Sequence, residues 1–178
     1  MIIAALDLGL THCGWARTTG DGPLSGVLST NKLRGCERLS WLRDEILFLV
    51  KDADLVLIEG YSYGSPNKRE ALGELGGVVR LALFEEGIPF MEVPPKSVKV
   101  FATNNGNASK PAMQAAAWKR LGYEGHDEHE VDAIWLLALG RIYYEQIPPK
   151  VVPATHLRAL AHLTFPIPRQ PELQLDSQ

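Results

Sequence analysis

The stretch IIAALDLGLTHCGWA, residues 2–16, indicates how the chain begins its fold. Ile2–Leu8 is apolar apart from Asp7, and a short apolar run of this kind is typical of a strand buried in the middle of a sheet. Two β-rich segments, 13–19 and 24–29, follow with turn residues between them. This part of the chain therefore predicts three consecutive antiparallel strands.

Strand and helix patterns alternate further along the chain. Apolar residues recur every three or four positions from Leu33 to Val50, which predicts a helix, and a second apolar strand pattern at 55–58 ends at Glu59. Further patterns predict a helix at about 69–86, a strand at 88–93, one or two helical turns at 96–102, and helices at about 110–121 and 128–146. We therefore expect an α/β fold, with a mixed five-stranded β-sheet (three antiparallel strands plus two more) flanked by α-helices.

One domain is expected to account for most of the chain. Its 178 residues, 46% of them hydrophobic, suffice for one compact domain and are too few for two ordinary ones. We expect this domain to span residues 1–147. Six of the twelve prolines lie in residues 148–178, which predict a Pro-rich C-terminal arm with a short helical piece at 155–163 rather than an independent domain.

The chain shows no signal for membrane insertion or secretion. No apolar run approaches the roughly 20 residues that span a bilayer, and the N-terminus has no basic segment of the kind that begins a signal peptide. Cys13 and Cys36 are too few for a disulfide framework and lack metal-site spacing. We expect a cytoplasmic protein.

Charge is unevenly distributed along the chain, whose net charge is −3. Residues 61–120 carry 8 basic and 5 acidic side chains, whereas residues 121–178 carry 4 basic and 8 acidic ones. Within residues 87–123 a single acid, Glu92, faces five cations: Lys96, Lys99, Lys110, Lys119 and Arg120. A basic segment in an acidic chain suits a protein that holds phosphates on one face and cations on another, although charge counts alone favour an ordinary solvated face.

Two acids end buried strands. Asp7 and Glu59 each close an apolar run, and an ionised carboxylate in such a place is costly unless it is paired. A backbone cap or an arginine explains either residue alone about as well as a functional role does. Strand carboxyl ends are, however, where open α/β sheets place their sites, so two such acids on neighbouring strands would point into one cleft.

A third acid and a histidine lie at the start of the last predicted helix. His129 and Asp132 are three residues apart and therefore share one helical face, beside the apolar stripe that should contact the sheet. Asp127 and Glu128 are explained by the helix N-terminus, where negative charge is favourable. Three carboxylates and an imidazole suit Mg²⁺ or Mn²⁺ better than zinc, and two such ions support phosphodiester hydrolysis.

These elements together resemble the RuvC-type Holliday junction resolvases, the crossover junction endodeoxyribonucleases of the ribonuclease H-like superfamily. The similarity spans roughly Ile2 to Tyr144 and rests on five segments in order: ALDLGLTHCGWA, VLIEG, ALGELGGVV, PPKSVKVFATNNGNASKPAMQ and HEVDAIWLLALG. The resemblance implies a ribonuclease H-like fold, paired symmetric nicks in four-way DNA junctions during recombination and repair, a homodimer, and two Mg²⁺ or Mn²⁺ ions per active site. A phage-encoded member fits the small chain with a divergent loop.

The resemblance also assigns roles to residues. It places Asp7, Glu59, His129 and Asp132 at the four catalytic and metal-coordinating positions. The third of these is more often Asp in the family, so His129 is either a ligand or a group that activates or orients the attacking water.

Six DNA contacts follow from the same comparison. Lys99 and Lys110 match lysines that contact DNA near the scissile phosphate. Tyr61 and Tyr63 flank the position of a family aromatic that wedges at the junction centre, and they either stack on a base or pack on their own loop. Lys68 and Arg69 are predicted phosphate contacts.

Several alternatives remain open from the sequence. One is a broader branched-DNA endonuclease that also cuts forks or flaps, and another is a catalytically silent junction-binding protein. A nucleotide-dependent phosphotransferase would share the turn DLGLT at residues 7–11 but would need two such folds, for which the chain is too short. The predicted helices at 33–50 and 71–83 both have apolar faces, so either is a candidate dimer interface.

Overall fold

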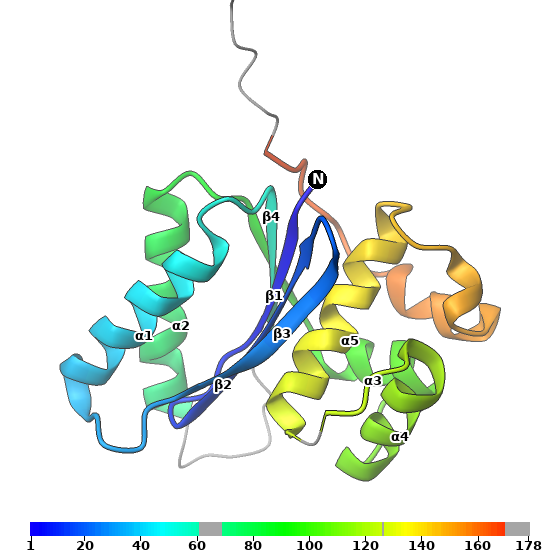
Figure 1. The fold of residues 1–178 in the computed structure, drawn as a ribbon, viewed down its shortest axis with the longest axis horizontal. Helices are drawn as coiled ribbons and strands as arrows, with labels where there is room; N and C mark the ends of the chain where they lie inside the picture. The colour runs from blue at the N-terminus through cyan, green and yellow to red at the C-terminus, as the bar shows by residue number, and fades with distance from the viewer. Residues whose placement is uncertain (61–68, 126, 170–178) are drawn as a thin grey trace, which may run out of the picture.

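The computed structural model describes residues 1–60, 69–125 and 127–169 (Figure 1). Side chains are described for all of these except residues 69–71. The strands are β1 (Ile3–Asp7), β2 (His12–Thr19), β3 (Gly22–Ser29), β4 (Leu55–Glu59) and β5 (Phe90–Val93). The helices are α1 (Gly35–Val50), α2 (Arg69–Glu85), α3 (Pro95–Thr103), α4 (Lys110–Leu121) and α5 (Glu128–Tyr143), followed by the 3-10 helices η2 (Pro149–Val151) and η3 (Ala154–Leu160).

The five strands form one mixed sheet in the order β3-β2-β1-β4-β5. β1, β2 and β3 pair antiparallel, whereas β4 lies parallel to β1 and β5 lies parallel to β4. This arrangement confirms the predicted mixed sheet of three antiparallel strands plus two more. It also brings the C-terminal ends of β1, β4 and β5 to one edge of the sheet.

Helices cover both faces of the sheet. Alternate residues of β1 enter two separate hydrophobic clusters, with Ile3 and Ala5 in one and Ala4 and Leu6 in the other, as the two-residue period of a strand requires. α1 and α2 cover the face of Ala4 and Leu6, and α5 covers the other, with α3 and α4 packed beside it (Figure 1). The fully buried Trp135 of α5 lies in the cluster of Ile3 and Ala5.

Several element ends differ from the sequence prediction, and hydrogen bonds explain two of these differences. The helix predicted over 128–146 ends at Tyr143, because Glu145 adopts a positive φ of 57° and the Gln146 amide bonds back to the Arg141 carbonyl at 2.7 Å. The strand predicted over 88–93 begins only at Phe90, because the Ile88 amide still bonds to the last turn of α2.

The described part of the C-terminal arm packs on the domain. The buried His156 of η3 donates through Nδ1 to the Phe101 carbonyl oxygen of α3 at 2.8 Å. Further along, the Tyr144 hydroxyl donates to the Pro166 carbonyl at 2.7 Å, and Arg169 donates to the Glu86 carbonyl at 2.6 Å. The division into a domain at 1–147 and an arm at 148–178 stays a prediction.

Candidate active site

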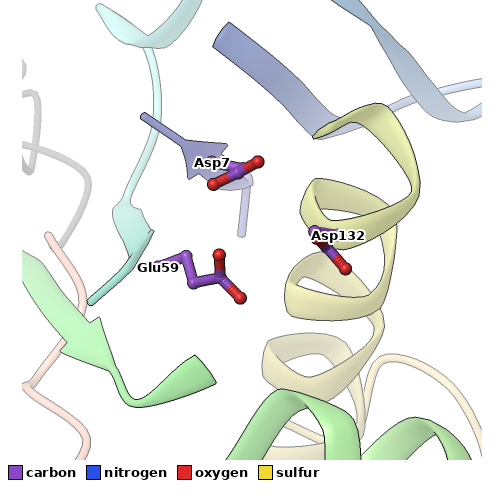
Figure 2. A group of neighbouring side chains, drawn as sticks. All are labelled: Asp7, Glu59 and Asp132. Atoms are coloured by element: carbon purple, nitrogen blue, oxygen red, sulfur yellow. The ribbon is translucent and has the colours of Figure 1, made fainter. Parts of the chain in front are cut away.

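Three carboxylates meet at the C-terminal edge of β1 and β4. Leu6 pairs with Ile58 in the parallel ladder, so Asp7 and Glu59, the next residues along, end neighbouring strands side by side. Asp132 enters the same space from the second turn of α5 (Figure 2). One oxygen from each carboxylate lies within 4.8 Å of the others, which is close enough to share a metal ion.

His129 contacts this group through Asp7. Its Nδ1 lies 2.6 Å from Oδ2 of Asp7, and its ring stacks on His12 with centroids 6.2 Å apart and planes at 12°. The hydrogen bond to Asp7 raises the pKa of His129, although partial burial opposes the shift. In this arrangement His129 is a partner of one carboxylate, and the group that shares a metal-sized space is Asp7, Glu59 and Asp132.

Burial and mutual repulsion raise the pKa of two of the three acids. The pKa of Glu59 is well above its ordinary value because of burial first and then the charges of Asp7 and Asp132. Burial, followed by the charge of Asp7, raises the pKa of Asp132 to about 7, while Lys99 and His129 act in the opposite direction. The described residues therefore provide too little positive charge to keep all three acids ionised. A divalent cation would supply that positive charge.

The donor set fits Mg²⁺ or Mn²⁺. All three shared atoms are carboxylate oxygens, the ligands that hard divalent cations prefer. Both cysteines are unsuitable alternatives, since the buried Cys13 thiol is fully protonated at neutral pH with a pKa raised to about 12, and Cys36 lies elsewhere on the exposed part of α1.

A cleft of about 920 Å³ opens over the carboxylates. Lys99 of α3 and Lys110 of α4, both predicted to contact DNA, line this cleft with the four predicted site residues. Lys110 also forms an ion pair with Glu128. The other predicted contacts lie outside the described part of the structure: Tyr61, Tyr63, Lys68 and the side chain of Arg69.

Two residues of the cleft were not predicted from the sequence. Arg38 of α1 lines the cleft opposite α3 and α4, and its buried Nε has no hydrogen-bond partner in the described ranges of the chain. His12, at the start of β2, stacks on His129. No local pattern marks Arg38, because it is one of several cations on an ordinary amphipathic helix. His12 lies within the segment 2–16, where no other candidate site residue stands at a helical or strand spacing from it.

Comparison with known proteins assigns the family. No protein-family model matches the chain. The crossover junction endodeoxyribonuclease RuvC of Anaeromyxobacter dehalogenans strain 2CP-C is 30% identical over 142 residues, which cover 75% of this chain and 77% of that protein. The chain belongs to the RuvC family. RuvC of Gloeobacter violaceus is 29% identical over 137 residues, covering 72% of this chain and 78% of that protein.

Solved RuvC structures share the fold. Thermus thermophilus RuvC superposes with a TM-score of 0.67 at 24% identity, over 82% of this chain and 97% of that one. The complex of Thermus thermophilus RuvC with a Holliday junction gives a TM-score of 0.68 at 21% identity, over 85% of this chain and 98% of that one. These matches confirm the predicted ribonuclease H-like fold, and the RuvC relatives at about 30% identity confirm the family resemblance. A phage origin stays a prediction.

Proposed function

We propose that this RuvC-family chain is a metal-dependent endonuclease that resolves four-way DNA junctions by paired symmetric nicks, in recombination and repair. The carrying observation is the meeting of Asp7, Glu59 and Asp132 within 4.8 Å at the base of a cleft that cations border. The acids suit divalent cations, and the cations suit the phosphates that the acids alone would repel. The proposal includes a cytoplasmic location, because the substrate is cellular DNA; none of the helices in the described ranges is long and apolar enough to cross a membrane.

The three carboxylates would hold two Mg²⁺ or Mn²⁺ ions. When bound, such ions activate a water for attack on the phosphodiester and stabilise the leaving oxygen. Asp7, Glu59 and Asp132 would bind them, and His129 would orient Asp7 through the 2.6 Å hydrogen bond. Two observations support this role for His129 rather than direct ligation. Its Nδ1 bonds to Asp7, and the group close enough to share a metal ion consists of the three carboxylates.

Cations on two sides of the cleft would position the strand. Lys99 lowers the pKa of both Glu59 and Asp132, so its ammonium group would lie near the expected scissile phosphate. Arg38 would hold a phosphate from the opposite side, and Lys110 would exchange Glu128 for a phosphate when DNA binds. Tyr61, Tyr63, Lys68 and Arg69 stay predicted DNA contacts.

A homodimer would supply the second active site that a symmetric pair of cuts requires. The outer faces of α1 and α2 expose large apolar side chains: Phe48 is 68% exposed, Leu81 56% and Phe84 75%. A Cβ built on Gly77, one turn before Leu81, would meet no atom within 4 Å, so a second helix has room to approach. We infer that this face, chiefly of α2, forms the dimer interface.

Cleavage of a labelled synthetic four-way junction tests the function. Matched duplex and a replication fork serve as competing substrates, in EDTA, Mg²⁺ and Mn²⁺, with Asp7→Asn as the inactive control. Paired, metal-dependent nicks near the crossover, absent from the variant, support the proposal. Equal cleavage of the fork would favour the broader branched-DNA nuclease, and tight junction binding without cleavage would favour the silent binding protein.

A further inference from the structure

One tryptophan is set apart from the other three. Trp135 is fully buried, and Trp15 and Trp41 pack against the core, whereas Trp118 of α4 is 64% exposed. A single exposed apolar residue is common on protein surfaces. Trp118, however, lines a groove next to the active-site cleft, which suggests a binding role.

Trp118 forms a wall of a groove of about 470 Å³. Tyr123 supplies a second aromatic side chain, and Pro111 supplies aliphatic surface. α4 ends at Leu121, and the next residue, Gly122, has a positive φ of 66° and turns the chain back along the helix. The Gln114 side-chain amide then donates to the Gly125 carbonyl at 3.0 Å, which holds the returning segment in place. The groove is therefore preformed, which lowers the entropy that a ligand would lose on binding.

The groove lies next to the active-site cleft. A smaller cavity of about 130 Å³ shares Pro111 and Gln114 with the groove, and it shares Lys110, Glu128 and Asp132 with the cleft. Lys110 and Trp118 are eight positions apart on one helix, a rise of about 12 Å. At about 3.4 Å per stacked nucleotide, this rise corresponds to about four nucleotides from the part of the cleft that Lys110 lines.

The charge of α4 favours nucleic acid as the occupant. Lys110 and Lys119 stand next to the groove-lining Pro111 and Trp118 along α4, and this helix holds no acidic residue, while Glu124 is the single charged residue that lines the groove itself. An apolar peptide would leave these cations without a function. Aromatic rings interleaved with cations are how proteins bind unpaired nucleotides, because every base has a face that stacks and every phosphate has a charge.

We propose that this groove binds a nucleotide of the strand that is cut, with its base stacked on Trp118 and its phosphates along α4. The proposal rests on the function proposed above and specifies how that site selects its strand. A base beside the crossover has lost a stacking neighbour, so it leaves its stack at lower cost than a base inside a duplex. Because stacking strengthens with ring area, the groove favours a purine at this position.

Junctions carrying the fluorescent base 2-aminopurine at successive positions around the cleavage site test this binding. Binding is measured in EDTA, so that the strand stays intact, for the wild type, Trp118→Ala, Trp118→Phe and Ile167→Ala, the last an 80% exposed apolar residue of the arm. We expect strong quenching at one position with the wild type and Trp118→Phe. Trp118→Ala should lose that quenching and bind the junction roughly 5- to 150-fold more weakly, whereas Ile167→Ala should match the wild type.

Two results overturn the proposal. One is a quenching pattern and affinity that Trp118→Ala leaves unchanged while its circular dichroism matches the wild type. The other is a change of oligomeric state in Trp118→Ala with unchanged DNA binding, which would make the groove a protein contact. Cleavage by the wild type in Mg²⁺ is measured on the same junctions. Absence of wild-type cleavage would contradict the proposed resolvase function, independently of the groove.

Discussion

Gly14 of β2 and His129 of α5 are in direct backbone contact, since a Cβ built on Gly14 would lie 2.0 Å from the His129 carbonyl oxygen. Gly14 is also the cross-strand partner of Asp7. The missing side chain therefore lets the first turn of α5 approach the sheet beside Asp7, the first carboxylate of the candidate site. This contact places His129 and Asp132 over Asp7.

The substitution Gly14→Ala should damage the site more than the fold. The added methyl group forces α5 away from β2, at a cost of about 1–3 kcal/mol in the free energy of unfolding. Cleavage should fall much further, because the metal-binding oxygens move apart. Gly20→Ala is the matched control, since a Cβ there meets no atom within 4 Å. Thermal unfolding and junction cleavage measure both effects, and wild-type cleavage by Gly14→Ala would refute the role of this contact.

The stability of the metal-free protein should fall as the pH rises. The folded pKa of Asp132 is about 7, well above the ordinary value of about 3.9, so the native state holds a proton that the unfolded chain releases. This contribution is fully present below pH 4 and is lost as the pH passes 7. The pKa values of Glu59 and His129 are also raised, so these two groups change the stability with pH in the same direction.

Mg²⁺ should therefore raise the Tm more at pH 8 than at pH 5, because metal competes with these protons. A stabilisation of 1 kcal/mol corresponds to about 2–4 °C in a protein of this size. Asp132→Asn should flatten both the pH dependence in EDTA and the response to Mg²⁺. Differential scanning fluorimetry measures this, and an equal Tm increase at both pH values would contradict the assignment of the metal site.

Removing the Arg38 guanidinium should weaken junction binding without unfolding the protein. Arg38→Gln removes one phosphate contact, so the slope of log affinity against log salt concentration should fall by about 1. Arg43→Gln on the same helix is the control, because Arg43 is exposed and pairs with Asp44 at 2.7 Å. Fluorescence anisotropy across a salt series measures both variants. Equal slopes for Arg38→Gln and the wild type would exclude a phosphate contact.

The role of His129 can be separated from that of a metal ligand. His129→Ala removes the hydrogen bond to Asp7, and the loss of such a supporting contact costs about 10- to 100-fold in metal affinity or activity. His129→Gln keeps an amide donor and should recover part of the loss. The metal concentration for half-maximal cleavage is the readout, with the exposed His162→Ala as control. A glutamine variant as defective as alanine would instead indicate that the imidazole transfers a proton.

The apolar face of α2 should govern assembly. Phe84→Glu introduces a charge into the proposed interface, and sedimentation should then show a 19.6 kDa species in place of twice that mass. Leu24→Glu, at a 54% exposed position of β3, should leave the dimer intact. Paired nicks should become single nicks in Phe84→Glu. A wild-type monomer that still makes paired nicks would refute the dimer proposal.

Sequence patterns were sufficient for the order of elements and for the carboxylates of the site. Asp7 and Glu59 could be selected because each ends a buried strand, and Asp132 because it shares a helical face with His129. These are local properties, since the two-residue period of a strand and the 3.6-residue period of a helix can be seen within a short window.

Tertiary structure was needed wherever distant segments meet. The approach of α5 to Gly14, the bond between His129 and Asp7, and the arrival of Arg38 at the cleft each join residues far apart in the chain. Their geometry depends on how helices pack on the sheet, and no periodicity records that. The Trp118 groove has the same origin: it exists because Gly122 turns the chain back along α4 and the Gln114 side chain holds it there.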